Sequence, residues 1–194
     1  MATNPNPRRV TEPMWWLWEQ FKAVEPTVQL GGIYASKPGY HNTRDGNDPA
    51  NYSVVHALDK QGPGDKAAAI DLTFPDAQAG RYATIIKYAD RLLKSGQDIH
   101  DERGNYLREF YGQADGDLAV EGWDFQAVTP STSDTSHLWH IHISFFTFYC
   151  DNWDAALGVY GLEGVLSVLS GETWEAWVAR KSGEDDMSSQ DSAR

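Results

Sequence analysis

Three of the six histidines in the chain, His137, His140 and His142, lie within six residues of one another. The run at 138–149 is rich in β-branched and aromatic residues and predicts a strand. Because side chains alternate between the faces of a strand, His140 and His142 should share one face while isoleucines fill the other. Two imidazoles on one face suit a metal ligand beside a general base.

A catalytic zinc ion typically takes three protein ligands, so an acid and a further histidine are needed. Asp71 interrupts the apolar run at 67–74, where an unpaired charge would be costly unless a cation compensates it. His41 lies in a loop rich in Gly and Asn at 36–49, where side chains can converge on a site held by a sheet. Asp45, four residues after His41, is the rival acid. The residues therefore predict a zinc site that combines His41, one of these acids and a histidine of the later strand.

Two short elements resemble a known group of zinc peptidases. An aspartate ends the small-residue stretch 67–71, and the later element reads Trp139, His140, Ile141, His142. Together they resemble the fold shared by D-alanyl-D-alanine carboxypeptidases, lysostaphin-type endopeptidases and the hedgehog signalling domain. The resemblance implies that His41, Asp71 and His142 bind zinc and that His140 is the catalytic base.

The chain departs from this family pattern at several positions. The family histidine seven residues before the aspartate falls on Gly64, so His41 is expected to substitute across an insertion at 42–66. A lysostaphin-like alternative pairs His41 with Asp45. Family members that end in Trp-His carry a catalytic acid two residues before the tryptophan. On that alignment His137 is catalytic and His140 binds zinc. Arg44 is the candidate for binding a substrate carboxylate.

The resemblance implies a hydrolase that cleaves peptide bonds in bacterial peptidoglycan, as a carboxypeptidase or as a cross-bridge endopeptidase. Residues 39–45 and 59–74 also look like small peptidases encoded among the tail genes of phages that infect actinobacteria. This similarity predicts a minor tail protein of the virion. The alternative is a catalytically inactive structural or binding component of a tail. Cys150 follows an apolar run and is expected to be a buried thiol rather than a nucleophile.

Composition narrows the class of protein. The 194 residues carry a formal net charge of -12, which argues against nucleic acid as a partner because binding phosphates relies on clustered Lys and Arg. The sequence has no run of about 20 apolar residues, the length that a membrane-spanning helix needs. The N-terminus lacks the apolar core of a secretion signal, so we expect synthesis in the host cytoplasm and action at the cell wall from the virion.

The resemblance implies an α+β fold like that of the hedgehog domain and the D-alanyl-D-alanine peptidases, a small central antiparallel sheet flanked by helices, and we expect it in a single domain at 11–180. A flexible arm is expected at 1–10 and a disordered tail at 181–194. A helix at 11–24 carries several tryptophans on more than one face, a candidate contact with other tail proteins. The other expected elements are strands at 27–35, 52–58, 67–74, 106–111, 123–128 and 138–149, helices at 75–94, 151–169 and 173–180, and a loop at 129–136.

Overall fold

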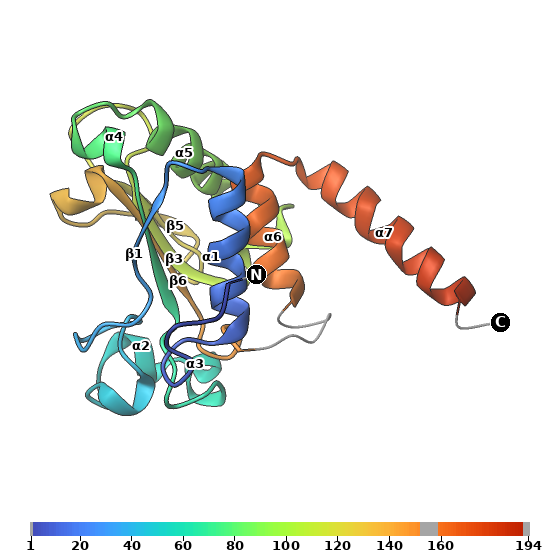
Figure 1. Cartoon of the computed structure of the whole chain (residues 1–194), viewed down its shortest axis with the longest axis horizontal. Coiled ribbons are helices and arrows are strands. Elements are labelled where there is room, and N and C mark those ends of the chain that lie inside the picture. The colour runs from blue at the N-terminus through green and yellow to red at the C-terminus, as the bar shows by residue number, and fades with distance from the viewer. Residues whose placement is uncertain (1, 152–158, 192–194) are drawn as a thin grey trace.

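The computed structural model describes residues 2–151 and 159–191. It contains one six-stranded sheet in the order β1-β2-β6-β3-β4-β5, in which every neighbouring pair is antiparallel. The α+β class and the antiparallel sheet flanked by helices are therefore confirmed (Figure 1). The strands are β1 Gln29–Gly32, β2 Ala69–Thr73, β3 Leu107–Gly112, β4 Glu121–Asp124, β5 Thr129–Ser131 and β6 His140–Phe145.

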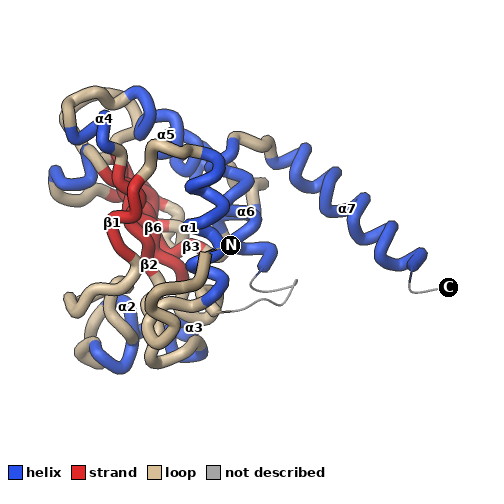
Figure 2. The backbone as a smooth tube through the Cα atoms, in the orientation of Figure 1, coloured by secondary structure: helices blue, strands red, loops and turns tan. Residues whose placement is uncertain are grey.

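The helices lie mainly on one face of this sheet. In Figures 1 and 2, α1, α5 and α6 stand on the same side of the strands. The α-helices are α1 Glu12–Val24, α2 Tyr52–Val55, α3 Ala57–Gln61, α4 Pro75–Gln78, α5 Ala83–Gln97, α6 Val159–Ser170 and α7 Trp174–Asp191. Short 3-10 turns are η1 Arg44–Gly46, η2 Glu102–Gly104 and η3 Thr135–Leu138. Within the described ranges, none of the helices combines the length and apolar character that crossing a bilayer requires.

The sheet face under these helices is the core. Ile70 of β2 and Ile141 and Ile143 of β6 are fully buried there, as the alternation of the two strands predicts. Their neighbours in sequence, Asp71 and His142, are only partly buried and point to the other face. The apolar residues thus fix the register that sends the polar ones toward solvent.

Helix α1 contributes aromatic residues to this core. Thr11 caps the helix by accepting a hydrogen bond from the backbone N–H of Met14. Trp18 is buried, and Trp15 and Trp16 are partly buried against the core. Much of the aromatic surface of the predicted helix is therefore used in packing within this chain.

The region expected as a strand at 52–58 is helical instead. The Asn51 side chain accepts from Ser53 N–H at the start of α2, and the His56 ring accepts from Leu58 N–H at the start of α3. These caps satisfy the first backbone donors of two short helices, which outweighs the β-branched side chains in the run. The prediction of a strand at 52–58 was therefore wrong.

Other boundaries also differ from expectation. The helix expected at 75–94 is divided into α4 and α5 because Gly80 adopts a left-handed conformation, with φ of 76°, between them. The loop expected at 129–136 contains β5 and the start of η3. Strand β6 ends at Phe145, earlier than expected, and α6 occupies the later part of the helix expected at 151–169. Positions 152–158 of that expected helix lie outside the described residues.

The structure describes most of the two segments that were expected to be a flexible arm and a disordered tail. Residues 2–10 lie against the domain rather than forming a free arm, since the backbone N–H of Ala67 donates to the Arg9 carbonyl and Asn4 is buried. Helix α7 continues through Asp191, where a disordered tail was expected from Lys181. Intrahelical hydrogen bonds need no tertiary partner, which allows a polar helix to extend away from the body, as in Figure 1.

A buried ion pair joins the helices behind the sheet. Asp101 accepts from Arg103 Nε at 2.8 Å and Nη2 at 2.6 Å and from the Ser95 hydroxyl at 2.7 Å. Arg103 Nη1 also donates to Ser167 Oγ and to the Glu172 carbonyl. Burial alone would raise the pKa of Asp101, but the hydrogen bonds from Arg103 outweigh it and lower the pKa.

We expect Asp101→Asn to lower the free energy of unfolding by about 3 kcal/mol, because it leaves a buried guanidinium unpaired. Since the folded state lowers this pKa, the stabilisation is complete above the unfolded pKa of about 3.9 and is lost as the pH falls through the folded value. Urea unfolding of the wild type and Asp101→Asn between pH 3 and 7 measures this difference in the free energy of unfolding. Asp90→Asn, which removes the exposed pair with Lys94, is the control and should cost less than about 1 kcal/mol.

Candidate metal centre

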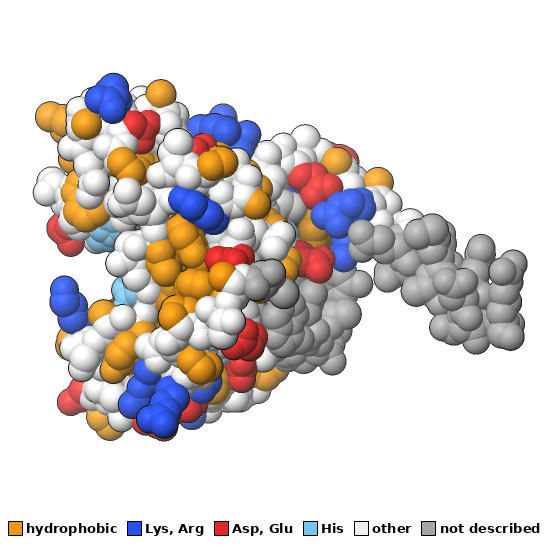
Figure 3. Space-filling view, viewed as in Figure 1, with side chains coloured by type: hydrophobic (Ala, Val, Ile, Leu, Met, Phe, Trp, Pro, Cys, Tyr) orange, Lys and Arg blue, Asp and Glu red, His pale blue; other side chains and the backbone are white. Residues whose placement is uncertain are grey.

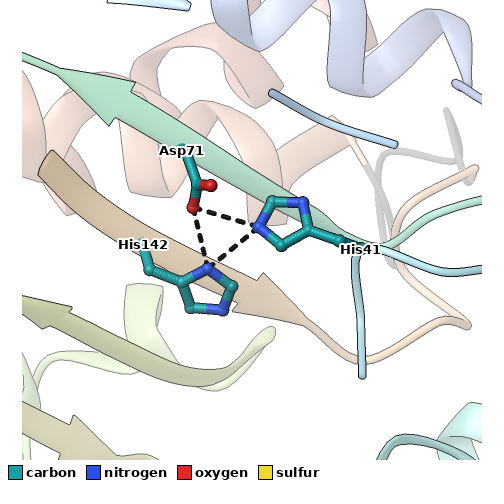
Figure 4. A group of neighbouring side chains, drawn as sticks. All are labelled: His41, Asp71 and His142. Carbon is teal, nitrogen blue, oxygen red and sulfur yellow. Dashed lines mark hydrogen bonds and ion pairs between the residues drawn. The ribbon is translucent and has the colours of Figure 1, made fainter. Parts of the chain in front are cut away.

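The open face of the sheet brings two of the predicted ligands together by strand register. Asp71 of β2 lies directly opposite His142 of β6. His41 comes from the loop after β1, where its carbonyl accepts from Ala35 N–H and its ring Nδ1 lies 2.8 Å from the Ile33 carbonyl. These bonds turn the imidazole back toward the strands, so that the three side chains point toward one another (Figure 4).

Three ligand atoms form a small triangle. His41 Nε2 lies 3.0 Å from Asp71 Oδ1 and 3.1 Å from His142 Nδ1, and His142 Nδ1 lies 2.9 Å from Asp71 Oδ1. Donor atoms held at about 2.0 to 2.2 Å around one tetrahedral zinc ion lie about 3.3 to 3.6 Å apart. The triangle is therefore close to the size that a single ion requires. We call His41, Asp71 and His142 the triad.

The hydrogen bonds outside the triangle orient lone pairs into it. His41 Nδ1 must donate to the Ile33 carbonyl, which leaves the lone pair of the neutral ring on Nε2. His142 Nε2 lies 2.7 Å from the Ser144 hydroxyl, and when it donates there its Nδ1 lone pair also faces inward. Two imidazole nitrogens and a carboxylate oxygen, all carrying lone pairs, then lie about 3 Å from one another. A cation between them would offset their mutual repulsion. The residues fit a divalent metal ion.

The electrostatics of the triad also favour positive charge. Burial alone would raise the pKa of Asp71, but His142 and His41, when protonated on the ring nitrogen that faces the carboxylate, donate hydrogen bonds that hold this pKa well below its usual range. Burial would lower the pKa of His41, whereas the hydrogen bond and charge of Asp71 raise it. The ionised carboxylate therefore attracts either a proton or a metal ion to the same point.

The structure places both remaining predicted histidines beside the triad. His140 Nε2 is 3.9 Å from Asp71 Oδ1, and the His137 ring lies 4.5 Å from the His140 ring, centroid to centroid. Burial lowers the pKa of His140 to about 4, although the charge of Asp71 opposes this shift. Burial also lowers the pKa of His137. Both rings are therefore neutral at pH 7, and His140 is the closer of the two to the triad carboxylate.

Asp45 does not join the site. Its side chain is 69% exposed, and its backbone N–H donates to the Gly64 carbonyl. Gly64 stands where the family pattern has a histidine. A Cβ there would lie 2.4 Å from the Asp45 carboxylate oxygens, so Gly64 packs directly against Asp45 and leaves no room for a larger side chain. Among the described residues that could bind a metal with His41, the acid close enough is Asp71.

Arg44 has a structural role that was not expected. Its Nη1 donates to the carbonyls of Asp59, Lys60 and Gly62 at 2.6 to 2.9 Å. These carbonyls surround the C-terminal end of α3, where a helix leaves acceptors without intrahelical partners. Arg44 Nη1 therefore stabilises the chain end of a short helix, and the binding of substrate by Arg44 stays a prediction.

Sequence reasoning missed residues that line the site from β3. Tyr111 lies opposite His142 in the β3–β6 pairing, and its ring stacks on that of His142 with centroids 6.1 Å apart. The Tyr111 hydroxyl donates to Glu109, as does the Tyr52 hydroxyl, each at 3.0 Å. The alternation of Glu109 and Tyr111 on β3 was visible, but its proximity to β6 depends on a pairing that is distant in sequence. The alternation of β6 also places Ser144 on the same face as His142, but its contact with the His142 ring could not be predicted from this pattern.

A cleft opens beside the triad. It has a volume of about 320 Å³ and runs along the end of β1 and the loop that carries His41. Figure 3 shows histidine side chains within a hollow on this edge of the molecule, with a basic side chain at its rim. The triad is therefore reachable by a small ligand.

Cys150 is fully buried, as expected, and burial raises the pKa of its thiol well above the usual range. Its Sγ donates to the Thr147 carbonyl at 3.2 Å. A buried, protonated thiol is a poor nucleophile, which argues against a cysteine hydrolase.

Comparisons of the chain with models of known families, with curated proteins and with solved structures found no match. The interpretation of function therefore depends on the geometry of the triad and on the short elements that carry it.

We expect zinc to raise the thermal stability of the wild-type protein, because an ion that binds the folded triad contributes about 2.7 kcal/mol at 100 times its Kd. His142→Ala should lose this stabilisation and His100→Ala, an exposed histidine outside the site, should keep it. Differential scanning calorimetry with and without zinc makes the comparison. Equal stabilisation of all three proteins would place the zinc elsewhere.

Proposed function

We propose that this protein is a zinc-dependent peptidase of bacterial peptidoglycan, built on the fold of the D-alanyl-D-alanine peptidase group. The observation that carries the proposal is the convergence of His41 Nε2, Asp71 Oδ1 and His142 Nδ1 beside an open cleft, with the neutral ring of His140 next to them. Two histidines, one acid and an accessible side are the composition of a catalytic rather than a structural zinc site.

Zinc, when bound, supplies Lewis acidity that activates water and polarises a peptide carbonyl. Side chains of the protein accept and donate the protons. Because burial keeps His140 neutral, its Nε2 can accept a proton near the triad and later return it to the leaving amine. We assign His140 as the general base on this ground.

His137 and Tyr111 enclose the same region. The His137 ring lies 4.5 Å from His140 and 5.5 Å from Tyr111, centroid to centroid. Its Nδ1 lies 3.1 Å from the Asp134 carbonyl, and donation there leaves Nε2 as the acceptor. We propose that His137 binds substrate or stabilises developing charge beside His140, a role secondary to the base.

The resemblance of short sequence elements to known peptidases supports peptidoglycan as the substrate and a phage tail as the location. The small-residue stretch 67–71, which ends in Asp71, and the Trp139 to His142 element resemble peptidases that act on peptidoglycan stems. Residues 39–45 and 59–74 resemble phage tail peptidases. We therefore propose a minor component of a virion tail that helps to open the cell wall. The remaining exposed aromatic surface of α1 is the proposed contact with other tail proteins.

Replacing the base separates chemistry from metal binding. We expect His140→Ala to lower the rate of peptidoglycan hydrolysis by about 10² to 10⁴-fold while zinc remains stoichiometric, because general base catalysis contributes that range. Mass spectrometry of fragments released from purified peptidoglycan, with metal analysis of the same samples, provides both readouts. His100→Ala is the matched control and should match the wild type.

Two results would contradict the proposal in different ways. Undiminished hydrolysis by zinc-loaded His140→Ala would remove the assigned base. Zinc bound at the triad without any fragment released by the wild type would instead favour an inactive binding component of a tail.

A further inference from the structure

The cleft beside the triad contains a single basic side chain. Apart from Asp71 and the two histidines of the triad, the charged residue that lines it is Lys37, on the loop between β1 and His41. Its charge reaches the triad, since it is one of the groups that act to lower the pKa of His41. Lys37 is thus placed to act on a ligand that occupies the cleft.

Lys37 also differs from the nearby arginines in having a free charge. Arg44 is committed to three backbone carbonyls, and Arg108 is paired with Asp124 at 2.6 Å and with Glu109 at 3.8 Å. Within residues 2–151 and 159–191, no side chain forms a hydrogen bond or ion pair with Lys37 Nζ. An exposed lysine without a side-chain partner among the described residues therefore lies at the cleft of a protein whose net charge is -12.

The charges around the cleft favour an anionic ligand group. A dication in the triad would outweigh the one carboxylate of Asp71, and Lys37 adds a further positive charge. Glu109, which contacts the cleft residue Tyr52, is buried and already accepts from two tyrosine hydroxyls. Charge of one sign in a cleft attracts the opposite sign and orients it.

The shape of the cleft favours the end of a peptide over its middle. Its volume of about 320 Å³ is at the lower limit of small-molecule sites, which span roughly 300 to 1,000 Å³. Gly31 and Gly32 form one wall without side chains, and Tyr34 and Tyr52 contribute aromatic rings. One or two residues with a terminal carboxylate match this space and this charge.

We propose that Lys37 binds the C-terminal carboxylate of a peptide whose last amide bond lies at the triad, so that the enzyme removes the terminal residue. The inference rests on the proposed peptidase function and assigns it to carboxypeptidase rather than endopeptidase action. Lys37 lines the cleft beside the triad, whereas Arg44 does not.

The test uses two matched peptides, an N-acylated D-alanyl-D-alanine and its C-terminal amide. The wild-type protein should cleave the acid in preference to the amide. Lys37→Ala should lower kcat/KM for the acid by about tenfold or more, the loss expected for one charge-assisted hydrogen bond, and leave the amide unaffected. Lys37→Arg should recover most of the preference. Lys94→Ala, an exposed lysine on α5, is the control.

A binding measurement keeps this inference separate from the proposed function. NMR titration of the same peptides into metal-free and zinc-loaded protein reports the preference for the acid even where neither peptide is hydrolysed. Hydrolysis of neither peptide by a wild-type protein that still releases fragments from peptidoglycan would overturn the carboxypeptidase assignment, whereas failure on the peptides and on peptidoglycan would overturn the peptidase. An acid preference that Lys37→Ala retains, or no acid preference in the wild type, would overturn the role of Lys37.

Discussion

A carboxylate and two imidazole nitrogens held within about 3 Å of one another form the constraint around which this protein is organised. Two of these groups are fixed by a single antiparallel register, in which Asp71 faces His142. A slip of one residue in either strand would turn that strand's triad side chain into the core and expose its isoleucines. The apolar packing of α1, α5 and α6 against the sheet therefore also maintains the spacing of the ligands.

The third ligand depends on a loop that the sheet itself orients. The Ile33 carbonyl, just after β1, accepts a hydrogen bond from Nδ1 of His41. The Ser144 hydroxyl contacts Nε2 of His142, the ring nitrogen that points away from the triad. Such outer partners fix the tautomer and direction of a ligand histidine and raise its basicity. The candidate metal site is thus shaped by backbone and side-chain groups outside the triad.

Prediction from sequence succeeded where local periodicity determines position. Alternation on one strand placed His140 and His142 on a common face, and an isolated acid in an apolar run identified Asp71. It failed where contacts come from distant segments. Arg44 is bound by carbonyls at the end of α3, a helix created by caps at Asn51 and His56 that the β-branched run concealed. Tyr111 reaches the site because β3 pairs with β6, which no local pattern encodes.

X-ray absorption spectroscopy at the zinc edge of the loaded protein tests the central claim most directly. The triad predicts light-atom ligands at about 2.0 to 2.2 Å, outer-shell scattering from two imidazole rings and no sulfur ligand. His142→Ala should reduce the imidazole contribution to one ring, whereas His140→Ala should leave it at two. A sulfur ligand, or a spectrum that is unchanged in His142→Ala, would show that the ion is not bound by His41, Asp71 and His142.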